Sequence, residues 1–290
     1  MKQNQNMILL ADSGSTKTTW VLLNDKKQVA ESHTQGFSPS FQKTETIASN
    51  MRTELGKEIL QEQKNNKLQI FYYGTGCSTE EKKQIVNKAL AAIFTEAKIT
   101  INHDLLASAL ALCGNKPGIA CILGTGSNSC YFNGKEIKEN LLSLGYFFGD
   151  HGSGAHLGKT LLQNYLDGNL PKDLENIFSA MPEFDKEHIL HNVYKEPLPQ
   201  RFLASYTKIM GNYMQHDFIK NLVKQCFSDF FIHQVEKYSL HKQVKINFVG
   251  SVAFHFQKQL HEVMSERGLQ QGIILQSPME GLVNYHLTGV

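Results

Sequence analysis

Residues 7–23, MILLADSGSTKTTWVLL, hold two apolar runs separated by a polar turn. The runs, residues 7–11 and 18–23, are rich in the aliphatic, β-branched and aromatic side chains of buried strands. The turn is too short for a crossover, so the two runs are expected to pair as an antiparallel hairpin. The same order of strand, Gly/Ser/Thr turn and strand returns at residues 119–132, IACILGTGSNSCYF. This repetition predicts two related halves.

Strand and helix signals alternate along the rest of the chain, which predicts an α/β protein. The turn NKPG at residues 115–118 indicates a domain boundary. We therefore expect an N-terminal domain at residues 1–114 and a C-terminal domain with a helical insertion at residues 115–277. A terminal helix at residues 278–290 can pack back on the first domain. Further strands are expected at residues 28–33, 68–73, 98–101, 245–249 and 272–275.

The composition excludes several classes of protein. Of 290 residues, 41% are hydrophobic and 19% charged, which suits folded domains with real cores. Lys and Arg number 29 against 27 Asp and Glu, so the charge is too balanced for an electrostatic nucleic-acid binder. We find no signal peptide and no apolar run of membrane length, and expect no membrane partner. The five cysteines form no C-x-x-C pair, which favours a reducing cytoplasm.

The two polar turns have the composition of phosphate-binding loops. Small residues let backbone N–H groups approach an anion, while Ser15 and Thr16 add hydroxyl donors and Lys17 adds a positive charge. Asp12, at the end of the buried strand, is placed to hold a hydrated Mg²⁺. A strand follows the turn, so the segment is not a Walker A loop, which a helix follows. For each turn the alternative is an ordinary polar hairpin.

Three further positions carry candidate chemistry. Asp104 opens an apolar helix and is either its N-cap or a general base that accepts the proton of an attacking hydroxyl. Asp150, in the loop GDHGSG, is either a ligand for sugar hydroxyls or a solvated loop residue. Gly250 and Ser251 lie between a strand and a helix, where nucleotides often bind in α/β proteins, although a plain turn is commoner there. The twelve histidines do not have the spacing of metal ligands.

Five segments, in order and spacing over nearly the whole chain, resemble the N-acetylglucosamine kinase family. These are ADSGSTKTTWVLL from Ala11, NHDLLASALAL from Asn102, CILGTGSNS from Cys121, GDHGSGAHLG from Gly149 and FVGSVA from Phe248. That family belongs with the BadF/BadG-type ATPases in the actin-like, sugar kinase and heat-shock ATPase superfamily. The resemblance implies two ribonuclease H-like domains with a central cleft that closes over substrate.

The resemblance also implies a role for individual residues. ATP binding falls on Gly14, Ser15, Thr16 and Lys17 in the first phosphate loop, on Thr125 and Gly126 in the second, and on Gly250, Ser251 and Val252 in the adenosine motif. Sugar binding falls on Ser38, Thr75, Gly76, Asn128 and Asp150. Asp104 matches the catalytic base. Asp12 would hold Mg²⁺ through water.

Two positions depart from the family pattern. His151 stands where the family usually has Glu, and Ser38 stands where it tends to have an Asn that contacts the sugar. Ser38 is the shorter side chain and could admit a bulkier substituent. These departures leave the identity of the sugar open.

The expected function is therefore phosphorylation of an amino sugar, N-acetylglucosamine or a close relative, at its 6-hydroxyl, with ATP and Mg²⁺. The sequence leaves open whether the protein forms a homodimer. One alternative is the activator ATPase of a radical dehydratase, although no cysteine pair clearly matches the iron–sulfur site that such a protein needs. Another is a non-catalytic sugar sensor, although no helix-turn-helix segment precedes Met7.

Overall fold

A computed structural model describes residues 6–14, 17–25 and 27–288. The candidate ATP-binding residues Ser15 and Thr16 lie outside the described residues. The chain divides into two compact units, one of residues Met1–Asn115 with Pro278–Val290, the other of residues Lys116–Ser277. In the described part of the chain, no helix combines the length and the apolar character needed to cross a membrane.

Unit 1 contains the first hairpin and its sheet. Its strands are β1 (Met7–Ser13), β2 (Lys17–Asn24), β3 (Gln28–Gln35), β4 (Leu68–Gly74) and β5 (Lys98–His103). Its helices are α1 (Thr44–Glu54), α2 (Lys57–Leu60), α3 (Glu80–Ala91), α4 (Asp104–Cys113) and α13 (Met279–Thr288).

The sheet of unit 1 has the order β3-β2-β1-β4-β5. The predicted hairpin forms, with β1 antiparallel to β2 and β2 antiparallel to β3. β4 runs parallel to β1, and β5 runs parallel to β4. The carboxyl ends of β1, β4 and β5 therefore lie at one edge of the sheet, which is the edge where ligands bind in α/β sheets.

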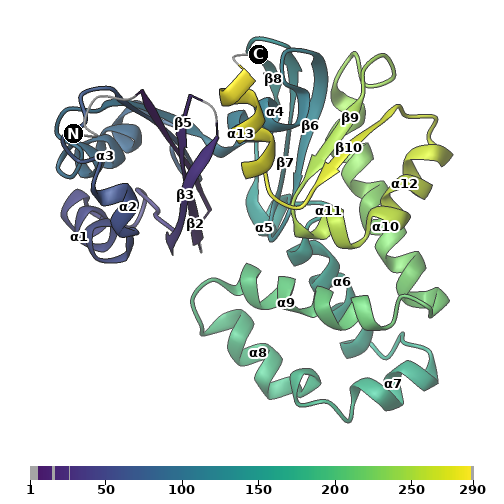
Figure 1. Cartoon of the computed structure of the whole chain (residues 1–290). Coiled ribbons are helices and arrows are strands. Elements are labelled where there is room, and N and C mark those ends of the chain that lie inside the picture. The colour runs from purple at the N-terminus through teal and green to yellow at the C-terminus, as the bar shows by residue number, and fades with distance from the viewer. Residues whose placement is uncertain (1–5, 15–16, 26, 289–290) are drawn as a thin grey trace. The chain divides into compact units, whose positions relative to one another are not determined.

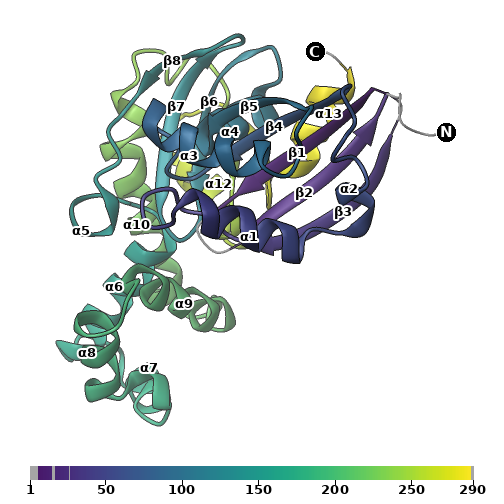
Figure 2. The ribbon, with the colours of Figure 1, turned by 90° about the vertical axis from the view of Figure 1, so that its left-hand side faces the viewer.

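Helices cover both faces of this sheet, as Figures 1 and 2 show: α1, α2 and α3 lie on one face, α4 and α13 on the other. Trp20 and Tyr72 lie at the centre of the first face, with their ring centroids 5.9 Å apart. Ile47 of α1 and Val86 of α3 belong to the same buried cluster. On the other face α13 packs against α4, so the end of the chain completes unit 1.

Unit 2 contains the second hairpin. Its strands are β6 (Pro117–Leu123), β7 (Ser127–Asn133), β8 (Ile137–Asn140), β9 (Ile246–Val249) and β10 (Gln271–Leu275). Its helices are α5 (Gly145–Phe148), α6 (Gly154–Leu166), α7 (Lys172–Phe178), α8 (Lys186–Tyr194), α9 (Pro199–Asn212), α10 (Asp217–His233), α11 (Ser251–His255) and α12 (Gln257–Glu266), with short 3₁₀ turns at Pro182–Phe184 and Val235–Lys237.

The two units share one topology. The sheet of unit 2 has the order β8-β7-β6-β9-β10. When its strands are numbered one to five along the chain, this order is 3-2-1-4-5, the same as in unit 1. In both sheets the first three strands are antiparallel and the fourth and fifth are parallel to the first. The predicted α/β class is confirmed, and the repeated hairpin marks the start of each sheet.

The helical insertion of unit 2 is built on a close contact between α6 and α9. A Cβ atom added to Gly158 of α6 would lie 1.8 Å from the carbonyl oxygen of Leu203 in α9, so only glycine allows this approach. Leu161 and Phe227 join the insertion and α10 to the core over the sheet. Within this unit, α7, α8 and α9 extend below the sheet in the view of Figure 1.

Candidate functional site

Three predicted site residues meet at the carboxyl edge of the sheet of unit 1. Ser13 pairs with Gly74, and Gly74 pairs with His103, so the ends of β1, β4 and β5 are in register. Asp12 is one residue before this level, while Thr75 and Asp104 are one residue after it. Three residues that are far apart in sequence thus lie at one edge of one sheet.

Asp104 is held by hydrogen bonds to both carboxylate oxygens. The backbone N–H of Leu105 donates to its Oδ1 at 2.9 Å, and the Thr75 hydroxyl donates to its Oδ2 at 2.7 Å. His103, rather than Asp104, is the N-cap of α4, because its Nδ1 accepts the N–H of Leu106 at 3.2 Å. Asp104 is the first residue of α4. Its carboxylate is therefore not used up by the N-cap role.

Asp12 is a half-buried carboxylate with a raised pKa. Burial, and secondarily the negative charge of Asp104, raise its pKa from 3.8 to about 7. A cation at this edge would relieve both effects, so Asp12 fits the Mg²⁺ ligand that the sequence predicts. Among the described residues no three His, Cys, Asp or Glu side chains are grouped to hold a metal. A Mg²⁺ that keeps most of its water is the kind that one or two carboxylates can hold.

The structure describes the two ends of the first candidate phosphate loop, Gly14 and Lys17. The N–H of Gly14 donates to the carbonyl oxygen of Lys17 at 3.0 Å. At its base the hydroxyls of Ser13 and Thr18 are 2.7 Å apart. Gly14 and Lys17 thus lie directly beyond Asp12 on the same hairpin.

The second candidate phosphate loop is joined to the start of α6. The carbonyl oxygens of Gly124 and Thr125 accept the N–H groups of Gly154 at 2.8 Å and Ala155 at 3.0 Å. A Cβ atom on Gly126 would lie 2.9 Å from Oδ2 of Asp150. These contacts bring Thr125 and Gly126 together with the loop that precedes α6.

Asp150 is anchored beside this loop. Its Oδ1 accepts the backbone N–H of Ser127 at 3.2 Å, and burial raises the pKa of its carboxyl group. Its φ of 52° lies in the left-handed region, which Asp tolerates better than most residues. Asn128 follows Ser127, but its Oδ1 accepts the N–H of Ser129 at 2.9 Å. The second loop and Asp150 form one cluster in unit 2, and Asn128 lies next to it along the chain.

The predicted adenosine motif adjoins the same cluster. Gly250 has a φ of +125°, and a Cβ atom there would lie 2.3 Å from the carbonyl oxygen of Leu123. Glycine therefore lets the start of α11 approach the end of β6. Ser251 and Val252 line a cavity of about 450 Å³. Its other walls are Thr207, Lys208, Gly211, Met214, His255 and Phe256.

The remaining predicted sugar contacts lie in unit 1. The N–H of Ser38 donates to Oε1 of Gln42 at 2.8 Å, and the N–H of Phe37 donates to the hydroxyl of Ser13 at 3.4 Å. A Cβ atom on Gly76 would lie 3.6 Å from Pro39. The loop with Ser38 therefore lies against the turn after β4 and beside the end of β1.

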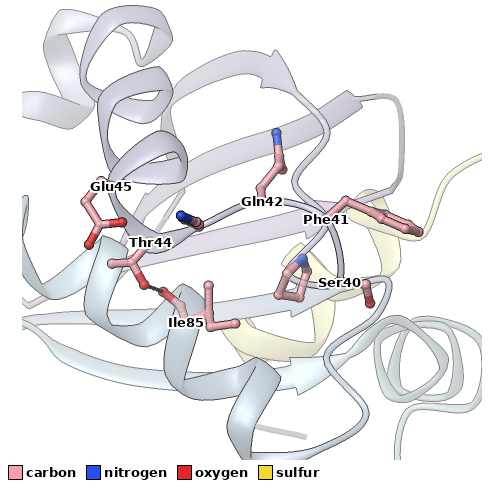
Figure 3. A pocket seen from close by; sticks show the side chains of 8 residues that line it. Ser40, Phe41, Gln42, Thr44, Glu45 and Ile85 are labelled. Carbon is pink, nitrogen blue, oxygen red and sulfur yellow. Dashed lines mark hydrogen bonds between the residues drawn. The ribbon is translucent and has the colours of Figure 1, made fainter.

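A cavity of about 410 Å³ lies between the segment that follows Ser38, the start of α1 and Ile85 of α3 (Figure 3). The hydroxyl of Thr44 donates to the carbonyl oxygen of Ile85 at 3.3 Å across one wall. Phe41 points away from this pair and is 88% exposed. The other lining residues are Pro39, Ser40, Gln42, Lys43 and Glu45.

Comparison with known proteins identifies the family. The model of the BadF/BadG/BcrA/BcrD ATPase family matches residues 11–168, which hold both candidate phosphate loops, the whole second hairpin and all of the first hairpin except the start of β1. The chain belongs to this family. No curated protein sequence matches the chain significantly.

Two solved structures of similar proteins agree with this family membership. A proposed N-acetylglucosamine kinase from Porphyromonas gingivalis is 39% identical, with a TM-score of 0.91, over 97% of this chain and 99% of that one. A proposed N-acetylglucosamine kinase from Chromobacterium violaceum is 18% identical, with a TM-score of 0.71, over 97% and 99%. The second likeness concerns the fold alone. The predicted fold class, two ribonuclease H-like domains of the actin-like ATPase type, is confirmed.

Two groups of residues near the candidate site had no recognisable pattern in the sequence. The wall of the unit 2 cavity that comes from α9 and the residues just after it gave no signal, because its side chains follow an ordinary helical pattern. The spacing of the histidines also does not indicate that three of them meet, yet the ring of His151 stacks on His233 at 4.2 Å and lies 5.4 Å from His156. Burial and the neighbouring His151 lower the pKa of His156 to about 4. His151, which departs from the family pattern, is thus part of a packed cluster of histidine rings.

Proposed function

We propose that this ATPase is a kinase that transfers the γ-phosphate of ATP to the 6-hydroxyl of an amino sugar. The observation that carries the proposal is the environment of Asp104, a carboxylate held on both oxygens in hydrogen bonds of 2.7 and 2.9 Å. The 39% identity with a proposed N-acetylglucosamine kinase supports the class of acceptor.

In the proposed reaction, Asp104 accepts the proton of the sugar hydroxyl as the oxygen attacks the γ-phosphorus. The bond between that phosphorus and the β,γ-bridging oxygen breaks, and its electron pair leaves with ADP. Mg²⁺, when bound, neutralises charge on the phosphates. Asp12 would hold that ion through water. The protein's own contribution is to position the hydroxyl, the base and the phosphates.

We assign the phosphates to the two Gly/Ser/Thr turns and the adenosine to unit 2. The absence of a side chain at Gly14, the backbone N–H group of Gly126 and the charge of Lys17 suit the phosphates. The cavity of about 450 Å³ beside Ser251 and Val252 has the size of a small-ligand pocket.

We assign sugar binding to Ser38, Gly76, Asn128 and Asp150. Thr75, which precedes Gly76 in the same loop, is assigned to the same region. Hydroxyl, amide and carboxylate groups of this kind recognise sugar hydroxyls through hydrogen bonds. Ser38 is shorter than the Asn common in the family, so we propose that it admits a bulkier substituent than N-acetylglucosamine carries. A strict preference for N-acetylglucosamine over N-acetylmuramic acid would contradict this point.

An ADP-release assay tests the proposal with N-acetylglucosamine, N-acetylmuramic acid and glucosamine as acceptors. We expect ADP release that depends on the sugar, with one phosphorylated sugar formed per ADP. Asp104→Asn should remove turnover while calorimetry still detects ATP binding. Asp185→Asn is the matched control, because Asp185 also lies at a helix start, where it caps α8 through His188. Equal ADP release with and without sugars would overturn the kinase proposal.

The activator ATPase of a radical dehydratase is the competing function. It requires cysteine ligands at a surface, whereas Cys77, Cys121, Cys130 and Cys226 are buried and Cys113 is half-buried. Iron–sulfur absorption after anaerobic purification would favour it over the kinase. Sugar binding without ATP consumption would instead favour a sensor.

A further inference from the structure

The Thr75 hydroxyl lies 2.7 Å from Oδ2 of Asp104 and donates a hydrogen bond to it. The carbon–carboxylate torsion of Asp is broad, because it joins an sp³ to an sp² atom. The N–H of Leu105 restrains only the Oδ1 side. The Thr75 hydroxyl is the second restraint, and two restraints on different oxygens define the plane of the carboxylate.

Thr75 is itself placed by a well-defined turn. Its N–H donates to the carbonyl oxygen of Ser13 at 2.9 Å, and the N–H of Cys77 donates to the carbonyl oxygen of Gly74 at 3.2 Å. A Cβ atom on Gly74 would lie 2.5 Å from the ring of the buried Tyr72, so this turn packs directly on the core. The hydroxyl is thus supported by β1, β4 and the core of unit 1.

We propose that Thr75 is a positioning residue that sets the plane of the Asp104 carboxylate, an inference that rests on the proposed function. A general base must aim a free lone pair at the proton it accepts. With one hydrogen bond on each oxygen, each oxygen of Asp104 keeps a lone pair for another partner. This role differs from the sugar contact that the family resemblance implies for Thr75, and the two roles have different kinetic signatures.

Thr75→Val tests the proposal because it removes the hydroxyl and keeps the shape. A misaimed base slows the chemical step, so we expect kcat for the sugar to fall about 10- to 100-fold while the KM values for sugar and ATP stay within about twofold. Thr75→Ser retains the hydroxyl and should stay within about threefold of wild type. Thr75 is exposed, so neither variant should lose its fold.

Thr53→Val is the matched control, because Thr53 is exposed like Thr75 and its hydroxyl donates to the backbone of Ser49 instead of a carboxylate. It should leave kcat unchanged. A raised KM for sugar with an unchanged kcat in Thr75→Val would assign Thr75 to sugar binding and overturn the proposal. Equal losses in Thr75→Val and Thr75→Ser would also overturn it, because the hydroxyl would then not matter.

Crystal structures of the Thr75 variants test the same inference without any turnover. We expect the carboxylate plane of Asp104 to rotate in Thr75→Val and to stay in place in Thr75→Ser. An unchanged plane in both variants would overturn the positioning role. Failure of the wild-type protein to phosphorylate any sugar would overturn the proposed function alone, since the carboxylate orientation would still be measured.

Discussion

At the scale of single residues, the proposed chemistry of unit 1 uses two carboxylates in different environments. Asp104 has hydrogen bonds to both oxygens, whereas Asp12 is half-buried and has its pKa raised to about 7. Both positions could be found from the sequence, because each follows a short apolar or β-branched segment typical of a strand. The raised pKa of Asp12 could not be found in this way, because burial depends on the packing of the whole unit.

Asp12→Asn is predicted to change how stability depends on pH. The folded-state pKa of Asp12 lies above its ordinary value of 3.8, so the folded protein holds this proton more tightly than the unfolded chain. The free energy of unfolding should therefore fall as pH rises from about 4 to about 7 and then level off. Removing the charge should stabilise the protein by about 2 to 4 kcal/mol at pH 8, at about 1.4 kcal/mol per pH unit, and by little at pH 4.

Urea unfolding at a series of pH values measures this effect. In wild type, added Mg²⁺ should raise the melting temperature at pH 8, because it binds the ionised carboxylate. In Asp12→Asn it should not. A variant that is less stable than wild type at pH 8 would contradict the buried-carboxylate argument.

At the scale of secondary-structure elements, the repeated hairpin was predictable and its surroundings were not. Apolar runs on both sides of a Gly/Ser/Thr turn indicate paired strands, and this pattern involves only residues that are close together in the sequence. The contact of α6 with α9 depends instead on Gly158 meeting the backbone of Leu203, about forty-five residues later by the numbering. Nothing near Gly158 in the sequence distinguishes it from any other helical glycine.

Gly158→Ala is predicted to destabilise unit 2. Its Cβ atom would lie 1.8 Å from the carbonyl oxygen of Leu203, so α6 and α9 would have to separate. We expect a loss of about 3 kcal/mol in the free energy of unfolding, measured by urea denaturation. Gly211→Ala is the matched control within α9, because no atom lies within 4 Å of the added Cβ. It should be neutral or stabilise by up to about 1 kcal/mol, and a similar loss in both variants would show that packing is not the cause.

At the scale of the whole molecule, the chain forms two units that each have a buried cluster. Unit 1 is not continuous in sequence, because α13 returns to pack on α4 after unit 2 is complete. A Cβ atom on Gly281 of α13 would lie 2.5 Å from the carbonyl oxygen of Ala111 in α4. The one tryptophan of the sequence, Trp20, is buried in unit 1 and reports on that unit.

Gly281→Ala and Gly158→Ala are predicted to lower the stability of different units. Gly281→Ala should lower the urea midpoint seen by Trp20 fluorescence, because it separates α13 from α4. Gly158→Ala should lower the midpoint seen by far-UV circular dichroism and leave the fluorescence midpoint in place. Equal shifts of both probes in both variants would mean that the two units unfold as one.

Local order in the amino-acid sequence was enough to indicate two hairpins, the alternation of strands and helices, and the loops where Asp12, Asp104 and Asp150 lie. Such features depend on residues that are close neighbours along the chain, so they can be recognised in the sequence before the fold is known. The tertiary structure alone decided that the Thr75 hydroxyl meets Asp104, that Asp12 is half-buried, and that the segment around α9 lines a cavity beside Ser251. These are contacts between distant segments, and they exist only once the packing of a whole unit brings those segments together.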